Sequence, residues 1–272
     1  MNWKQTLFWS FSTAAIFYYF LLFGVFVFVG QEEMQLFIPE WWYIREFLFQ
    51  PGGFCAVAGQ WILQYYRQPM SAVVLHTVLL VGCGFMVYRI LRCFSDKTYL
   101  LFLSLLPVLY LVKMSIHGEY LVDGTVGVVL MLLALSVSLK VRRAGSIAGY
   151  GIASTLFLCG LTGLLSVCYA FLYTLLALLR YKTSRQRLAA AACLIPALFI
   201  YLFSGWLGIP VPLSDGWMPE AYLEIQRLPH YYMYRVWTFF TLSIVGVALF
   251  ARFVPVIGEK SKWMDRVALV VC

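Results

Sequence analysis

The sequence predicts an all-α protein, a bundle of helices that crosses a membrane about eight times. Of its 272 residues, 62% are hydrophobic and only 12% are charged, whereas about 25% of the residues in a soluble domain are charged. A soluble core of this size could not hide so much apolar surface, so we expect lipid to be the solvent. Apolar runs recur along the chain, and lysine and arginine gather in alternate connecting segments, which is typical of membrane proteins.

Each apolar run is assigned to one span of a single transmembrane domain, residues 1–272. The first run follows a lone Lys4 and has no small-residue cleavage site, so we interpret it as a retained span rather than a signal peptide. Pro196 predicts a kink in the seventh span. The chain ends in six apolar residues, too few to span, so we expect it to be the N-terminal part of a longer protein. The predicted spans are 6–29, 70–91, 98–113, 120–139, 145–159, 163–179, 188–207 and 236–257.

Residues 145–180 require two short spans instead of one. At 1.5 Å per residue this stretch is too long for a straight helix across a hydrocarbon core of roughly 30 Å. Basic clusters flank it, at residues 140–143 and 180–187. If both clusters are cytoplasmic, the chain must cross twice between them, and Cys159–Gly163 is then the outer turn of a hairpin.

The distribution of charge predicts the orientation. With a cytoplasmic N-terminus, fifteen of the 20 basic residues fall on the inner side, as the positive-inside rule requires, and nine of the 12 acids fall outside. We therefore expect a bacterial inner-membrane protein. The net charge of +8 does not indicate a nucleic-acid partner, because no basic stripe with interleaved aromatic residues is present. The inner basic residues are Lys4, Arg89, Arg92, Lys97, Lys140, Arg142, Arg143, Arg180, Lys182, Arg185, Arg187, Arg252, Lys260, Lys262 and Arg266.

The first outer segment, residues 31–69, is the leading candidate for a functional site. Glu32 and Glu33 follow the first span directly, at the outer face of the membrane. Residues 41–43, Trp-Trp-Tyr, are typical interfacial anchors. Residues 54–66 predict an apolar helix that lies in the interface or dips into the membrane; the alternative is a packing element without further function. Its polar stripe consists of Gln60, Gln64 and Arg67.

Two further outer segments carry candidate substrate-binding residues. Glu119 and Asp123 are spaced to share a helix face, and an acid one turn inside an apolar run is a functional hypothesis, with Lys113 as the nearest partner. The alternative is a structural ion pair. His117 could assist proton transfer or serve only as a hydrogen-bonded loop residue. Arg227 could bind a phosphate, or lie on a solvated surface helix.

The absence of several well-known motifs argues against the corresponding classes of enzyme. The sequence has no Walker lysine loop, GxGxxG, HExxH or GxSxG, so nothing indicates an ATPase, a dinucleotide enzyme, a zinc protease or a serine hydrolase. No metal site is identified, although an outer carboxylate could hold a divalent cation against a phosphate leaving group. His76 falls inside the second span, and we expect it to form a hydrogen bond between helices. The seven cysteines form no CxxC pair and are expected to pack as small hydrophobic residues.

A first span, an acidic motif directly outside it and a long outer segment with interfacial helices together resemble the front half of a GT-C type glycosyltransferase. The stretch Glu32-x-x-Gln35-x-Phe37, followed by Pro51-Gly52-Gly53, also resembles an uncharacterised bacterial multi-span family. The resemblance covers residues 1–125. It implies a catalytic acid at Glu32, with Glu33 as the competitor, and a polyprenyl-phosphate sugar as donor. GT-C members often have an aspartate in this loop, and this chain has none.

The resulting hypothesis is a GT-C-like glycosyltransferase that takes a sugar from a lipid carrier at the outer face of the membrane. Membrane lipid is then its immediate partner. The alternative is a non-catalytic multi-span scaffold or a transport-associated subunit. Replacing Glu32 or Glu33 with glutamine distinguishes the two, because a transferase loses activity while a scaffold tolerates both changes.

Overall fold

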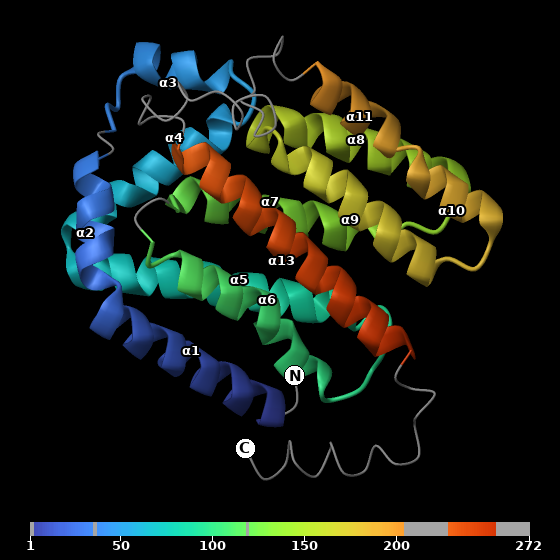
Figure 1. Cartoon of the computed structure of the whole chain (residues 1–272), viewed down its shortest axis with the longest axis horizontal. Helices are drawn as coiled ribbons and strands as arrows, with labels where there is room; N and C mark the ends of the chain where they lie inside the picture. Colours follow the sequence, from blue (N-terminus) through green and yellow to red (C-terminus); the bar gives the residue numbers. More distant parts are fainter. Residues whose placement is uncertain (1–2, 35–36, 118–119, 204–227, 254–272) are drawn as a thin grey trace.

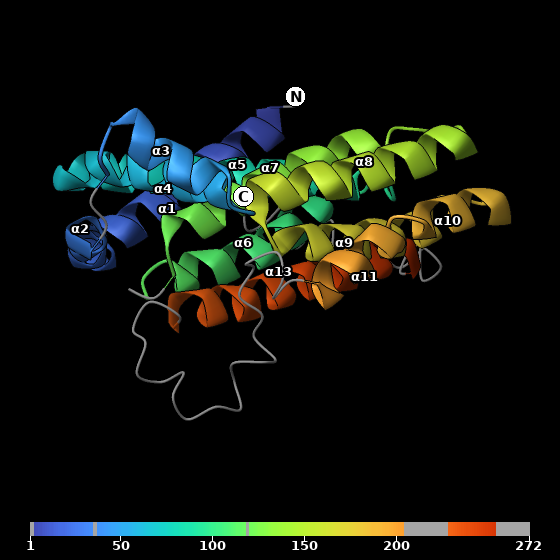
Figure 2. The same cartoon turned by 90° about the horizontal axis from the view of Figure 1, so that it is seen from above.

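The computed structural model describes residues 3–34, 37–117, 120–203 and 228–253, and all of the regular structure in these ranges is helical. Most of the long helices run side by side between the two ends of the molecule (Figure 1). In Figure 2, α13 lies on the side of the bundle opposite to α3. The elements are α1 (Trp3–Phe23), α2 (Val25–Met34), α3 (Trp41–Leu48), α4 (Gly53–Leu63), the 3-10 helix η1 (Gln64–Arg67), α5 (Pro69–Leu91), α6 (Leu100–Met114), α7 (Val122–Ser138), α8 (Ala144–Thr162), α9 (Leu165–Arg180), α10 (Ser184–Ala191), α11 (Leu194–Leu202) and α13 (Leu228–Phe253).

Four helical stretches of the described chain are long and apolar enough to cross a membrane. They are Trp3–Phe23, Pro69–Leu91, Ala144–Thr162 and Ser184–Leu202. Four shorter apolar helices accompany them, namely Leu100–Met114, Val122–Ser138, Leu165–Arg180 and Val236–Arg252. Large apolar side chains cover the outside of the bundle, among them Phe11, Leu106 and Phe157, as expected where the surroundings are lipid. Length and composition therefore indicate a membrane protein.

Most predicted helices have the expected bounds, but the first predicted span, 6–29, is wrong. The chain breaks at Gly24, and α2 turns away from the axis of α1 to lie across the end of the bundle (Figure 1). A Cβ at Gly24 would come within 2.9 Å of the Phe28 ring and 3.0 Å of the Phe20 carbonyl. A side chain at this position would require the Phe28 ring to move, and the apolar sequence on both sides does not reveal the bend.

The kink predicted at Pro196 is present, one turn before the proline. α10 ends at Ala191 and α11 begins at Leu194. Proline has no N–H to donate to the carbonyl four residues earlier, and its ring clashes with that carbonyl. For Pro196 this is the carbonyl of Ala192, which instead accepts a 3.2 Å hydrogen bond from the Ile195 N–H.

Successive helices place their connecting turns at opposite ends of the bundle (Figure 1). One end, here called the basic end, carries the turns after α5, α7 and α9. The other, here called the acidic end, carries α2, α3, α4 and the turns after α6 and α8. The turn between α8 and α9 falls at Gly163 and Leu164, so the predicted helical hairpin is confirmed.

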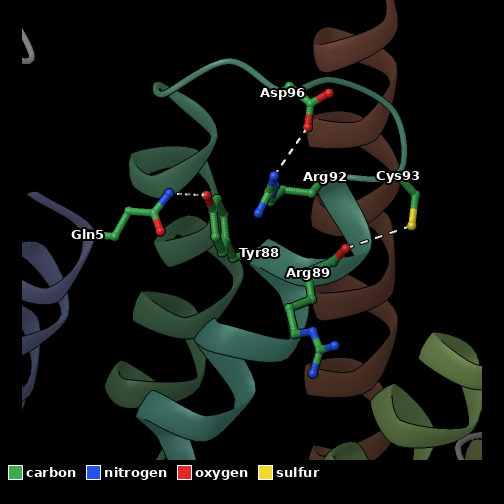
Figure 3. A network of polar contacts seen from close by, with 6 residues as sticks. All are labelled: Gln5, Tyr88, Arg89, Arg92, Cys93 and Asp96. Atoms are coloured by element: carbon green, nitrogen blue, oxygen red, sulfur yellow. Dashed lines mark hydrogen bonds and ion pairs between the residues drawn. The ribbon is translucent and has the colours of Figure 1, made fainter. Parts of the chain in front are cut away.

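At the basic end, α1 is attached to α5 by a polar contact. The side-chain amide of Gln5 donates a 3.0 Å hydrogen bond to the Tyr88 hydroxyl. Further along the same turn, Arg92 forms an ion pair of 3.4 Å with Asp96, on the surface (Figure 3). The start of α1 therefore lies beside the end of α5, as two neighbouring antiparallel helices require.

Candidate functional site

The acidic end is organised by α4, which packs directly on α7. Cys55, Gly59 and Leu63 lie on one face of α4 and are buried. Gly59 is so close to Asp123 that an added Cβ would lie 2.7 Å from the aspartate Cβ and 2.9 Å from its amide nitrogen. The added Cβ of Gly127, one turn along α7, would lie 3.7 Å from the Cys55 sulfur. α4 is therefore packed against the start of α7 through Cys55 and Gly59.

Two glycine turns hold α4 in this position. Gly52 (φ +85°) precedes α4 and Gly163 (φ +61°) follows α8, both in a region that favours glycine. Their backbones touch, because a Cβ on Gly52 would lie 3.3 Å from the Gly163 nitrogen. The Gly52 N–H also donates a 3.1 Å hydrogen bond to the Gly160 carbonyl. The Pro-Gly-Gly sequence before α4 thus forms a turn that attaches α4 to the end of α8, and does more than separate α3 from α4.

The polar stripe predicted on α4 faces the preceding segment. Tyr43 of α3 donates a 3.1 Å hydrogen bond to the Gln60 side chain. Gln64 donates to the Phe37 carbonyl at 3.4 Å. No residue of α3 is buried, and Trp41 and Trp42 are exposed. α3 therefore covers α4 with its polar contacts while its tryptophans face outward, as expected of interfacial anchors.

Gln31 joins the end of α2 to the segment after α6. Its side chain is fully buried, and its amide donates a 2.8 Å hydrogen bond to the Tyr120 carbonyl, 89 residues away. Thr125 of α7 in turn donates to the Tyr120 hydroxyl at 3.3 Å. The helical turn that carries Glu32 and Glu33 is thus fixed beside residues 120–125. The Gln31 side-chain oxygen is buried and has no hydrogen-bond partner within the described residues.

Asp123 occupies the first turn of α7 and is largely buried against α4. Its carboxylate accepts a 2.6 Å hydrogen bond from the Gly124 N–H. A negative charge at this end of a helix is favourable because the unpaired N–H groups point toward it. The predicted partner is wrong: Lys113 is exposed, and the one ion pair among the described residues is Arg92–Asp96. Asp123 is held by its own helix and not by a lysine.

Of the remaining predicted site residues, the structure describes some and leaves others outside its described ranges. His117 is exposed in the turn after α6, where its backbone carbonyl accepts a 3.0 Å hydrogen bond from the Tyr120 N–H. Glu119 and Arg227 lie outside the described residues, as do the side chains of Glu32 and Glu33, although their backbone is part of α2. No group of three or more His, Cys, Asp or Glu that could hold a metal ion occurs in the described part of the chain.

Beside Gln31 lies an aromatic cluster that includes His76. The Tyr66 hydroxyl and the His76 Nδ1 are 2.7 Å apart, and both side chains are buried. The rings of Phe20 and Phe28 lie 5.1 and 4.8 Å from the imidazole, measured between centroids. The hydrogen bond predicted for His76 is present, but its partner is η1 rather than a long helix. Sequence spacing gave no sign of Tyr66, which lies in the outer segment ten residues before the histidine.

Burial dominates the electrostatics of the outer segment. Burial, with the nearby Asp123 carboxylate adding to it, raises the pKa of the Cys55 thiol to about 12. Burial also raises the pKa of the Tyr66 phenol. Both groups therefore stay protonated at neutral pH, so neither is a nucleophile.

No curated protein and no solved structure matches this chain. None of the comparisons links it to the GT-C glycosyltransferases. One family model matches, and it covers residues 1–269, nearly the whole chain. The chain therefore belongs to a family of unknown function, DUF6057.

Proposed function

We propose that the protein crosses the bacterial inner membrane eight times, with its N-terminus in the cytoplasm. The spans are α1, α5, α6, α7, α8, α9, the α10–α11 pair and α13. The alternation of turns between the two ends supports this arrangement. The basic end then faces the cytoplasm, as the positive-inside rule requires, and the acidic end faces outward.

The proposed activity is that of a GT-C-like glycosyltransferase, using a polyprenyl-phosphate sugar at the acidic end. The observation that carries it is the 2.8 Å hydrogen bond between Gln31 and the Tyr120 carbonyl. Through it, the turn bearing Glu32 and Glu33 meets the start of α7, which carries Asp123. Two acid-bearing segments, remote in sequence, thus share one end of the bundle. That is the level at which a lipid carrier presents its headgroup.

The transfer needs a base and a stabilised leaving group. The bond between the sugar C1 and the carrier phosphate oxygen breaks, and the phosphate leaves with the electron pair. A new bond forms between C1 and the acceptor hydroxyl oxygen, whose proton passes to Glu32 or Glu33. The exposed tryptophans of α3 support the proposal, because exposed tryptophans are typical of segments at a lipid interface.

The test uses the full chain in lipid nanodiscs with a panel of polyprenyl-phosphate hexoses and pentoses, with water as the acceptor hydroxyl, and measures release of polyprenyl phosphate. We expect release with at least one donor and a loss of 100-fold or more on Glu32→Gln or Glu33→Gln, since a positioned base contributes roughly 10²–10⁴-fold. Glu46→Gln, in α3, is the matched control and should retain the activity. Absence of release with every donor, or unchanged release in both variants, overturns the proposal.

A non-catalytic scaffold or transport-associated subunit is the second candidate, and the surroundings of Asp123 favour it. The carboxylate accepts a hydrogen bond from the N–H of Gly124 in its own helix, and the backbone and Cβ of Asp123 lie against Gly59 of α4. This is the geometry of a packing residue. A scaffold tolerates both glutamate substitutions and fails instead when a helix face is altered.

A further inference from the structure

The turns after α7 and α9 are joined into one unit at the basic end. The Tyr181 hydroxyl donates a 2.7 Å hydrogen bond to the Val141 carbonyl. The Gln186 amide donates to the Arg142 carbonyl at 2.7 Å. Within the second loop, the Arg187 Nε donates a 2.8 Å hydrogen bond to the Tyr181 carbonyl. Two loops about 40 residues apart thus form a single surface.

This surface carries seven basic side chains and no acid. Residues 140–143 and 180–187 contain no aspartate or glutamate. In the part of the chain that the structure describes, the one ion pair is Arg92–Asp96, in the neighbouring turn (Figure 3). The positive charge of the joined loops is therefore uncompensated by described residues. The patch, here called the basic frame, consists of Lys140, Arg142, Arg143, Arg180, Lys182, Arg185 and Arg187.

Arg180 is the member of the basic frame that most needs an acceptor. Its side chain is only partly exposed, and its Nη1 atom is buried without a hydrogen-bond partner among the described residues. A buried charged donor without an acceptor is costly. Arginine presents a planar fork that matches phosphate oxygens.

We propose that the basic frame binds the phosphate of an anionic lipid headgroup, with Arg180 as the central ligand. Apolar side chains border the frame on the same helices: Leu178 is 42% exposed and Leu188 is 76% exposed. A free phosphate ion makes no use of them, whereas the acyl chains of a lipid cover them. The inference rests on the membrane placement proposed above, but not on the glycosyltransferase activity.

The experiment titrates the full chain, purified in a neutral detergent, with phosphatidylglycerol, phosphatidylcholine or inorganic phosphate, and counts bound lipid by native mass spectrometry. We expect phosphatidylglycerol to bind and phosphatidylcholine to bind more weakly. Arg180→Gln should weaken phosphatidylglycerol binding about fivefold, the effect of one basic residue near an anionic surface. Arg180→Lys, which keeps the charge but loses the fork, should fall between. Lys113→Gln, an exposed charge at the acidic end, should leave binding unchanged.

Three outcomes overturn the inference. Phosphatidylcholine binding as tightly as phosphatidylglycerol removes the role of charge. Displacement of the lipid by an equimolar amount of inorganic phosphate identifies a free-phosphate site instead. A loss on Lys113→Gln equal to that on Arg180→Gln shows only general electrostatic attraction. If Arg180→Gln does not fold by circular dichroism, the exposed pair Arg142→Gln and Arg143→Gln replaces it. Because no sugar donor is used, the result is independent of the Glu32 and Glu33 assay.

Discussion

Gly59 of α4 and Asp123 of α7 pack backbone against backbone, so that a Cβ on the glycine would lie 2.7 Å from the aspartate Cβ. Two helices can approach so closely only where one of them has no side chain. The contact fixes the depth at which α4 sits against the bundle. It therefore sets the position of α4 relative to Asp123 at the start of α7.

Gly59→Ala should destabilise the protein. The new methyl group meets the backbone of Asp123, which cannot rotate away, and overpacking of this kind costs about 1–3 kcal/mol. Gly82→Ala on α5 is the matched control, because nothing lies within 4 Å of the added Cβ. The measurement is the midpoint of thermal unfolding in detergent. Equal midpoints for the two variants would contradict the close approach of α4 and α7.

Gly163→Ala should destabilise the protein through a different mechanism. Alanine rarely adopts the φ of +61° found there, at a cost of about 1–3 kcal/mol. Its methyl group would also lie 3.5 Å from the Gly52 Cα. Gly160→Ala is the control three residues earlier, where the added Cβ meets nothing within 4 Å. Urea or thermal unfolding of both variants checks the difference, and a stable Gly163→Ala would show that the turn is free to adopt another conformation.

Tyr66→Phe should destabilise the protein by about 1–3 kcal/mol, because it leaves the buried His76 Nδ1 without its partner. His76→Leu removes the other partner. In a double-mutant cycle, the double variant should lose less than the sum of the single variants. Additive losses would show that the 2.7 Å contact contributes nothing as a pair.

The two thiols Cys55 and Cys93 should differ in reactivity. The thiolate is the reactive form, and burial beside Asp123 raises the pKa of the Cys55 thiol to about 12. Cys93 is exposed at the basic end. Incubation of the folded protein with N-ethylmaleimide at pH 7.5, followed by peptide mass spectrometry, should label Cys93 and spare Cys55. Unfolding in dodecyl sulfate should make both reactive; rapid labelling of Cys55 in the folded protein would refute its burial.

Reporter fusions test the orientation. Alkaline phosphatase, which is active only outside the cytoplasm, should be active when fused after Gly163 and inactive when fused after Arg185. Green fluorescent protein should give the reverse pattern. Phosphatase activity after Arg185 would mean that residues 145–180 cross the membrane only once. The acidic end and the basic frame would then no longer lie on the sides of the membrane proposed for them.

The helices could be predicted from the sequence because hydrophobic runs and charge act locally. The second predicted span, 70–91, differs from α5 by one residue, and the α8–α9 hairpin follows from the basic clusters on both sides. The break at Gly24 could not be predicted, because it depends on how α2 packs across the bundle. Its flanking residues are as apolar as those of a straight span.

The candidate site was predictable in composition but not in geometry. The acids after the first span and at Asp123 stand out in the sequence as charges beside apolar runs. The Gln31–Tyr120 hydrogen bond joins residues 89 positions apart, and no local pattern encodes such a contact. Lys113 was the wrong partner for Asp123 because the N–H of the next residue satisfies the carboxylate.

The contact between Gly52 and Gly163 has a consequence for biosynthesis. Gly52 emerges from the ribosome long before the α8–α9 turn that it must meet. Until that hairpin has inserted, α4 can pack only on α7, and the turn at Gly52 lacks the backbone that it contacts in the finished fold. Truncation before residue 163 should therefore leave the early segment open to proteolysis, even though every residue of it has already been made.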